Sequence, residues 1–252
     1  MEPLSIEVDA GLALVQLQRP AERNVLSIAL MRALTQAART LAERTDVQTV
    51  ILAGAGGCFS AGVDLKEAPT WADAAMPLVE RREIAALGYR LCKAWEEMPQ
   101  LTIAAIEGYA VGGGLALALA CDWRVLADDA FVSLPEIALG IPLTWGTIPR
   151  LVALAGPARA KRLTILCERW SAEQAQAIGL ADYLAPHGTA LARARELAAQ
   201  VLAMPAAAVR MSKETVNAVA TVQHHAASHM AHDQIALAAA SGIAFGKAKP
   251  GA

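Results

Sequence analysis

The chain has 252 residues, of which 55% are hydrophobic and 18% charged, and its formal net charge is −2. This composition excludes general disorder and is typical of a well-buried α/β protein with one large domain, or one domain and an appendage. Nucleic acid is not an expected partner, because the balance of charge is slightly acidic and no basic run occurs. The start, MEPLSIEVDAG, lacks the basic residues and apolar core of a signal peptide, so we expect a cytoplasmic location and no membrane association.

Neither the cysteines nor the histidines predict a metal site. The four cysteines are far apart, without a C-x-x-C pair, and indicate buried thiols in a reducing compartment: Cys58, Cys92, Cys121 and Cys167. His225, His229 and His232 could share one helix face, a spacing that can bind metal. No carboxylate with the spacing of a zinc site accompanies them, and we interpret this face as solvated or as a subunit contact. No metal or redox cofactor is expected.

Short strands precede each helix in the first half of the chain. The expected elements are a hairpin over residues 4–18 that turns at Asp9-Ala10-Gly11, a helix over Ile28–Arg44, a buried strand over Thr49–Ala53 and a helix over Leu78–Met98. Glycines 54, 56 and 57 form a turn after the buried strand. The pattern predicts repeated strand–strand–helix units.

The second half changes from this pattern to continuous helix. The expected elements are strands over Thr102–Ile106, Trp123–Ala127, Phe131–Leu134 and Leu180–Leu184, and helices over Leu115–Ala120, Ala158–Cys167, Ser171–Ile178, Leu191–Met204 and Ala206–Ala240. We therefore predict an α/β core followed by a helical C-terminal region.

The stretch Leu101–Asp122, LTIAAIEGYAVGGGLALALACD, is the most informative part of the chain. A strand, the run Gly112-Gly113-Gly114 and a helix start would present free backbone N–H groups to an oxygen that carries negative charge. The spacings of the dinucleotide fingerprint and of the phosphate loop are both absent. The alternative is that the glycines only permit close packing of helix on strand.

Three stretches together resemble the crotonase (enoyl-CoA hydratase/isomerase) family. They are CFSAGVDLKE at residues 58–67, AAIEGYAVGGGLALALACD at residues 104–122 and LPEIALGI at residues 134–141. Supporting matches are RPAERNVLS at residues 19–27 and WSAEQAQAIGLAD at residues 170–182. The resemblance follows the order of the family over nearly the whole chain.

This resemblance implies a spiral of ββα units with a helical C-terminal region that builds trimers, often paired into hexamers. We expect the spiral core and the acyl-CoA site in residues 1–187, and the oligomerisation region in residues 188–252. The substrates would be acyl-CoA thioesters, with no cofactor beyond the CoA moiety. Carried over by motif, the two oxyanion-hole amides belong to Val63 and Gly113, and removal of one such donor typically costs about 2.7–4 kcal/mol in the transition state.

The resemblance also places residues near CoA. Lys66, in the DLK sequence, and Ala61, just before the first oxyanion turn, would lie along the CoA portion. Arg23, in the ERN turn, could meet a CoA phosphate. The alternative for both Lys66 and Arg23 is an ordinary solvated surface charge.

Many hydratases of the family use two glutamates, and this chain has one of them. The first position, on the helix after the glycines, is Ala116 here; the second is Glu136, with the alternative that Glu136 only caps a helix start. Shifting a double bond needs a single base, whereas adding water is easier with two carboxylates. We therefore favour enoyl-CoA isomerisation slightly over hydration, with the pKa of Glu136 raised by its apolar neighbours Leu134 and Ile137.

The segment after the last motif departs from the family pattern. Leu143 and Trp145 stand where small residues and glycines are common, and Trp145 would fill or reshape the acyl pocket; the alternative is a tryptophan of the core or of a subunit contact. Two other functions stay open. One is a non-catalytic acyl-CoA-binding protein, and the other is a different thioester-enolate reaction such as decarboxylation.

Overall fold

The computed structural model describes residues 3–67, 75–222, 224–228, 231 and 233–240. Its strands are β1 (Leu4–Asp9), β2 (Leu12–Leu17), β3 (Thr49–Gly54), β4 (Leu101–Ile106), β5 (Tyr109–Val111), β6 (Trp123–Ala127), β7 (Phe131–Ser133), β8 (Trp170–Ser171) and β9 (Tyr183–Ala185). Its α-helices are α1 (Ile28–Ala42), α3 (Leu78–Ala85), α4 (Leu87–Glu96), α5 (Gly113–Ala118), α6 (Thr147–Ala155), α7 (Pro157–Ile165), α8 (Ala172–Ala177), α9 (Ala190–Leu202), α10 (Ala206–Ala220), α11 (His224–Ser228) and α12 (Asp233–Ala240).

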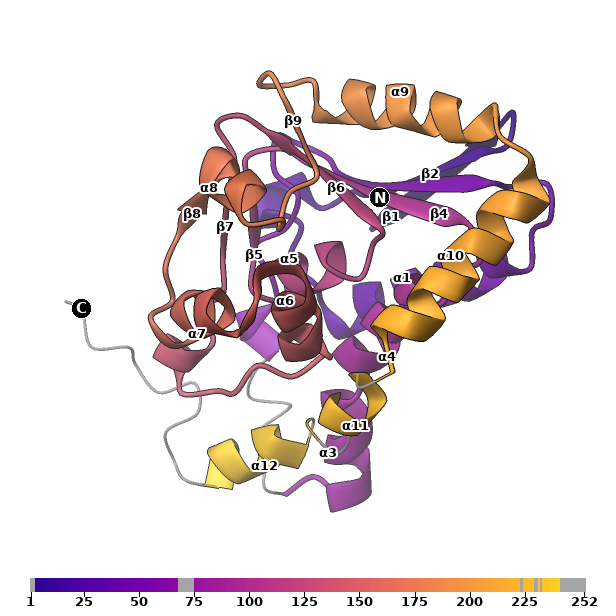
Figure 1. The fold of residues 1–252 in the computed structure, drawn as a ribbon. Coiled ribbons are helices and arrows are strands. Elements are labelled where there is room, and N and C mark those ends of the chain that lie inside the picture. Colours follow the sequence, from indigo (N-terminus) through magenta and orange to yellow (C-terminus); the bar gives the residue numbers. More distant parts are fainter. Residues whose placement is uncertain (1–2, 68–74, 223, 229–230, 232, 241–252) are drawn as a thin grey trace.

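A six-stranded sheet in the order β1-β2-β3-β4-β6-β9 forms the centre of the fold (Figure 1). Only β1 and β2 pair antiparallel; the four other pairs are parallel. The β1–β2 turn has positive φ at Ala10 (45°) and Gly11 (85°), the geometry that suits the twist of a two-residue hairpin. The predicted hairpin is confirmed.

Strand alternation divides the core into two layers. Val50, Leu52 and Ala104 point into the larger cluster, with α1, α4 and α5, whereas Ile51 and Ile103 point into a second cluster with α9. Figure 1 shows α9 along the side of the sheet away from α5. Both faces of the parallel strands are thus covered, as their continuous apolar sequences require.

A smaller, three-stranded sheet lies beside the first, in the order β5-β7-β8. The second strand of successive strand–strand–helix units contributes to it. β5 pairs parallel with β7, β7 pairs antiparallel with β8, and a parallel bridge joins Ser60 to Ala110. Each turn of the chain, β3 with the Ser60 segment, β4 with β5, and β6 with β7, therefore contributes one segment to each sheet. This is the predicted spiral, and it carries the glycine segments to the same side of the molecule.

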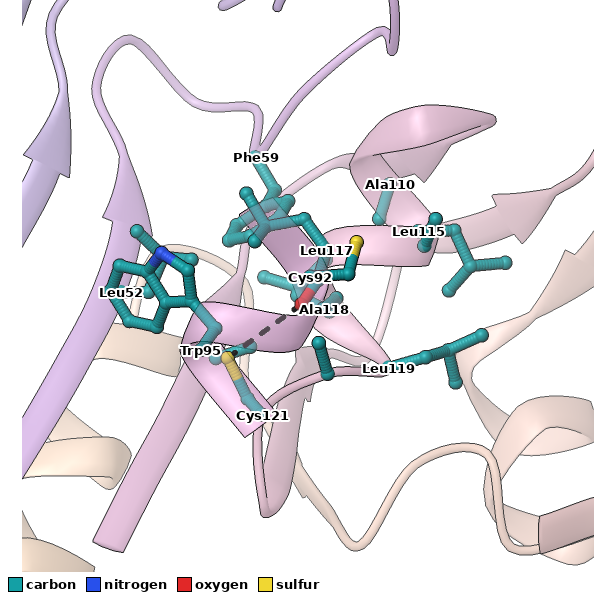
Figure 2. Close-up of a cluster of buried hydrophobic side chains, with 14 of the residues drawn as sticks. Leu52, Phe59, Cys92, Trp95, Ala110, Leu115, Leu117, Ala118, Leu119 and Cys121 are labelled. Carbon is teal, nitrogen blue, oxygen red and sulfur yellow. Dashed lines mark hydrogen bonds between the residues drawn. The ribbon is translucent and has the colours of Figure 1, made fainter. Parts of the chain in front are cut away.

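Helix α5 is buried on all sides, which fixes where its first residue lies. Its six residues are all buried, and Figure 2 shows Leu117 near Phe59 and Cys92, and Leu115 beside Ala110. The Cys121 thiol donates to the Leu117 carbonyl at 3.8 Å. Small side chains such as Ala118 allow this close approach to α4.

Two predicted helices are interrupted. The segment predicted as one helix over Leu78–Met98 is divided into α3 and α4 at Ala86, although Ala86 still donates to the Arg82 carbonyl. The continuous helix predicted over Ala206–Ala240 is wrong, because α10 ends before Thr221 and shorter helices follow. The backbone leaves helical geometry at Thr221, with φ −100° and ψ 5°, and Thr221 and Val222 are β-branched residues with low helix propensity.

Lys213 anchors α10 to the sheet. It is the one buried residue of α10, and its Nζ donates to Asp122 Oδ2 at 2.6 Å and to the Gln100 carbonyl at 2.7 Å. The same Asp122 oxygen accepts bonds from the backbone and hydroxyl of Thr102. Asp122, the last residue of the stretch Leu101–Asp122, therefore belongs to a structural ion pair.

We expect Lys213→Ala to lower the free energy of unfolding by about 3 kcal/mol, because the part-buried charge of Asp122 would lose its buried partner. Chemical denaturation at one fixed protein concentration measures the loss. The matched control is Lys93→Ala, which removes an exposed lysine 3.6 Å from Glu97 and should cost only about 0.5 kcal/mol. Equal losses in the two variants would contradict the anchoring role.

Candidate active site

Two glycine-containing segments meet at the side of the sheet where β3 and β4 end. Leu26 forms a parallel bridge with Val63: its N–H donates to the Gly62 carbonyl at 2.7 Å and its carbonyl accepts from Asp64 N at 3.2 Å. In a parallel bridge the groups of the opposite residue point away from its partner. The Val63 N–H therefore points away from Leu26, on the side where Gly113 lies.

Gly113 supplies a second backbone donor next to this one. It is the first residue of α5, so its N–H has no acceptor within the helix. Its nitrogen lies 3.3 Å from the position that a Cβ on Gly62 would occupy. Within the described part of the chain, neither Val63 N nor Gly113 N donates to a backbone or side-chain acceptor. Two amide donors are thus available at one place, as an oxyanion hole requires.

The close approach of the segments depends on glycine at two positions. Gly62 has φ +88°, and a Cβ there would lie 2.7 Å from the Val111 carbonyl oxygen. Gly112 has φ +54°, and a Cβ there would lie 2.8 Å from Glu136 Oε1. Any larger residue would push the two loops, or the loop and the carboxylate, apart.

Glu136 carries the carboxylate that faces this glycine turn. It follows β7 and Pro135, and it precedes a 3₁₀ turn over Ile137–Leu139. Its side chain makes no capping hydrogen bond, and its Oε2 is buried without a hydrogen-bond partner. Glu136 thus occupies the N-cap position of the turn without a side-chain capping bond, and a buried carboxylate oxygen is left available to another group.

Burial raises the pKa of Glu136 from 4.5 to about 7. Leu134 is fully buried beside it, as expected, whereas Ile137 is 44% exposed and contributes less to the desolvation than the sequence indicated. A carboxyl group with this pKa exchanges a proton readily near neutral pH, which suits a general acid or base.

The other carboxylates near the motifs have partners. Asp64 accepts from Lys66 N at 3.1 Å and lies 3.8 Å from Arg19. Glu107 accepts from Gly188 N and Ala190 N, and so holds the start of α9. Of the carboxylates that the structure describes, Glu136 alone has a buried oxygen with no hydrogen-bond partner. This distinguishes it from the structural acids.

The predicted pocket residues Ala116, Leu143 and Trp145 lie on the apolar side of the site. Ala116 is 3% exposed and belongs to the large core cluster, and Leu143 packs against that cluster. Trp145 is 8% exposed, and a Cβ on Gly113 would lie 2.7 Å from its indole ring. Trp145 is thus both a core residue and a neighbour of the candidate amide donor.

The residues predicted to lie near CoA are at the outer end of the same segments. Ala61 N donates to the Arg23 carbonyl at 3.0 Å, which joins the first glycine segment to the turn before α1. Arg23 and Lys66 are exposed. Their side chains are therefore accessible to a solvated ligand, and Ala61 fixes the loop between them.

A cavity of about 650 Å³ lies elsewhere, between α10 and the ends of β4, α5 and α6. None of the described residues that line it is Val63, Gly113 or Glu136. Over the described ranges, no group of three or more potential metal-ligating side chains occurs, and no helix has both the length and the apolar character to cross a bilayer. His229 and His232 of the histidine face lie outside those ranges.

Sequence reasoning missed three residues that shape the site. Gly88, on α4, lies against Trp145, and a Cβ there would lie 1.7 Å from the indole. Arg150, on α6, donates to the Trp145 carbonyl at 2.9 Å, and Glu96 holds Arg150. An isolated glycine inside an amphipathic helix was the one available signal, since such a glycine often marks a close contact.

The comparisons with known proteins agree with this geometry. The family model for enoyl-CoA hydratase/isomerase matches residues 7–240. A probable enoyl-CoA hydratase of Mycobacterium bovis is 34% identical, over 86% of this chain and 81% of that protein. A crotonyl-CoA hydratase of Syntrophomonas wolfei is 31% identical, over 86% of this chain and 82% of that protein.

Solved structures show the same fold. The crystal structure of an enoyl-CoA hydratase from Mycobacterium avium superposes with a TM-score of 0.86 at 26% identity, and covers 94% of both chains. The family match, the relatives and the shared spiral lead to one conclusion: this chain belongs to the enoyl-CoA hydratase/isomerase, or crotonase, family.

Proposed function

We propose that this chain converts enoyl-CoA thioesters with one carboxylate, Glu136, and two backbone donors, the N–H groups of Val63 and Gly113. The observation that carries the proposal is the buried Oε2 of Glu136, which has no hydrogen-bond partner. The carboxylate lies against Gly112, the residue before the Gly113 amide. The raised pKa of Glu136, about 7, supports an acid/base role.

Isomerisation follows from these groups without a further residue. The ionised carboxylate of Glu136 removes a proton from C2 of a 3-enoyl thioester, and the electron pair moves into a dienolate. The two N–H groups donate to the thioester oxygen, where the negative charge collects. The protonated Glu136 then returns the proton to C4, which leaves a 2-enoyl thioester and the original carboxylate.

Hydration is the second candidate, and it is favoured by the relatives, which are named as hydratases. Here Glu136 takes a proton from water while the oxygen adds to C3 of a 2-enoyl thioester, and the same group then protonates C2. Ala116 replaces the second carboxylate that would help to hold this water. We therefore favour isomerisation slightly.

The wider proposal concerns assembly, CoA binding and location. Exposed apolar side chains along α10, Met211, Val216 and Val219, support assembly into a homotrimer or hexamer. The exposure of Arg23 and Lys66 supports contact with the CoA portion. The proposed location of the protein is the cytoplasm.

A paired assay separates the two reactions. We expect the purified protein to convert a 3-enoyl-CoA to the 2-enoyl isomer without adding water, as identified by mass and chromatography. Hydroxyacyl-CoA formed from 2-enoyl-CoA would establish hydration instead. Binding of thioesters without any product would favour the non-catalytic protein, and loss of CO₂ from a malonyl-type thioester would favour decarboxylation.

We expect Glu136→Gln to lower kcat by at least about 100-fold, because the amide cannot accept the proton. Binding of an unreactive acyl-CoA should stay within a few-fold of that of the wild type, since the backbone donors remain. Glu173→Gln, at an exposed position in the first turn of α8, is the control and should leave both quantities unchanged. Full activity of Glu136→Gln would remove Glu136 from the mechanism.

The pH profile provides an independent test of the same group. Because the base must be ionised in the free enzyme, we expect kcat/KM to rise tenfold per pH unit below about pH 7 and to level off above it. Measurement with one substrate across the range from pH 5 to pH 9 gives the profile. A midpoint near the ordinary carboxyl pKa of 4.5 would contradict the buried setting of Glu136.

Burial of Glu136 should also cost stability when the group is ionised. Its folded-state pKa of about 7 lies above the ordinary value of 4.5, so the cost is absent below 4.5 and complete above 7. We expect Glu136→Gln to be more stable than the wild type by about 3 kcal/mol at pH 8, and this advantage to shrink as the pH falls toward 4.5. Denaturation at several pH values measures the difference; a constant difference would contradict it.

A further inference from the structure

Trp145 has a backbone conformation that a bulky residue rarely adopts. Its φ is +57°, in the left-handed region, and Gly146 after it has φ +70°. For a residue other than glycine this conformation is unfavourable, and it persists only where the surroundings enforce it. The surroundings of Trp145 therefore need an explanation.

The indole of Trp145 lies between two glycines on different helices. A Cβ on Gly88 of α4 would lie 1.7 Å from indole Cε2, and a Cβ on Gly113 of α5 would lie 2.7 Å from its Cη2. A Cβ on Gly113 would also lie 3.2 Å from Val63 Cγ2. The indole is thus beside both residues whose amides are the candidate oxyanion donors, so an acyl chain bound there must pass close to it.

A buried ion pair holds the backbone of Trp145. Arg150 Nη1 donates to the Trp145 carbonyl at 2.9 Å, while its Nε and Nη2 donate to the two oxygens of Glu96 at 2.8 Å each. The Arg150 side chain is 5% exposed, and Glu96 is 19% exposed. A two-pronged contact of this kind fixes the plane of the guanidinium, and with it the direction of its third donor.

Two other residues contact Glu96, and neither competes for the hydrogen bond from Arg150 Nη1 to the Trp145 carbonyl. The Asn217 side chain donates to the Glu96 carbonyl at 3.1 Å, and His224 Nδ1 lies 3.5 Å from Glu96 Oε1. Helix α4 therefore contacts Trp145 in two ways. Gly88 packs against the indole, and Glu96 binds the Arg150 side chain that donates to the Trp145 carbonyl. An ion pair that served stability alone would not need a donor directed at a strained carbonyl.

We propose that Glu96 and Arg150 are positioning residues that hold Trp145 as the end wall of the acyl pocket, and that this wall selects short acyl chains. The inference rests on the proposed function, because it needs an acyl thioester at Val63 and Gly113. Trp145 contacts the substrate, whereas Glu96 and Arg150 act through it. The preferred substrates are thioesters whose chain ends before the indole.

The test is a double-mutant cycle on the binding of butyryl-CoA and decanoyl-CoA, two saturated thioesters that the proposed reaction cannot convert. We expect the wild type to bind butyryl-CoA more tightly. Trp145→Gly, which suits the positive φ, should shift the affinity ratio toward decanoyl-CoA by at least about tenfold, since each newly buried methylene contributes about 0.8 kcal/mol. Trp145→Phe, with a smaller ring, should shift the ratio in the same direction by less and guards against a folding defect.

Arg150→Lys keeps the charge and loses the two-pronged contact, so it should shift the ratio in the same direction, and Glu96→Gln should do likewise. In the Trp145→Gly background neither change should shift the ratio further, because the wall that they position is gone. Arg162→Lys, at an exposed arginine paired with Glu168, is the matched control and should leave the ratio unchanged.

Each alternative outcome has a distinct meaning. An Arg150→Lys protein with lower stability and an unchanged ratio would overturn the positioning role. Shifts that persist in the Trp145→Gly background would show action by another route, and would overturn it as well. If neither thioester binds the wild type or Trp145→Gly, the proposed function itself fails and this inference fails with it. If both bind and the affinity ratio is unchanged in Trp145→Gly, only the role of Trp145 as the end wall is overturned.

Discussion

The rest of the site depends on the close approach of two backbone segments, one at Gly62 and one at Gly112. Their N–H groups can converge only if no side chain separates the loops, and the contact of 2.7 Å that a Cβ on Gly62 would make with Val111 shows how little space remains. The spiral arrangement makes the approach possible, because successive units place equivalent segments side by side in the small sheet. The burial of α5 then fixes the direction of the second amide.

Among the carboxylates in the described part of the chain, Glu136 is the one with a buried oxygen that has no hydrogen-bond partner. Most buried polar atoms in a folded protein have a partner, and a buried carboxylate without one disfavours its own ionised form. Other charges packed against the core, such as Asp122 with Lys213 and Arg124 with Asp182, are paired. The unpartnered oxygen of Glu136 therefore indicates that this carboxylate interacts with a group outside the protein.

The parts of the structure that sequence reasoning predicted are those encoded locally. The hairpin around Ala10, the glycine turn before α5 and the position of Glu136 after Pro135 each depend on residues close together in the chain. The contacts of Trp145 do not: Gly88 is on α4, Arg150 is on α6, and only the folded chain brings them to one place. The break after α10 was missed for a different reason: the apolar periodicity continues past it, whereas the backbone leaves helical geometry at Thr221, which is followed by a second β-branched residue, Val222.

The same amide pair can serve different reactions, and what packs against it decides which one. In this chain the helix after the glycines presents Ala116 to the core instead of a second carboxylate, and an indole lies against Gly113. Both residues are apolar, whereas the carboxylate of Glu136 lies against Gly112. Apolar surroundings strengthen hydrogen bonds to a developing oxyanion, because fewer water dipoles compete for its charge. One base beside an apolar wall therefore supports the proposed movement of a proton within the substrate over the capture of a second molecule.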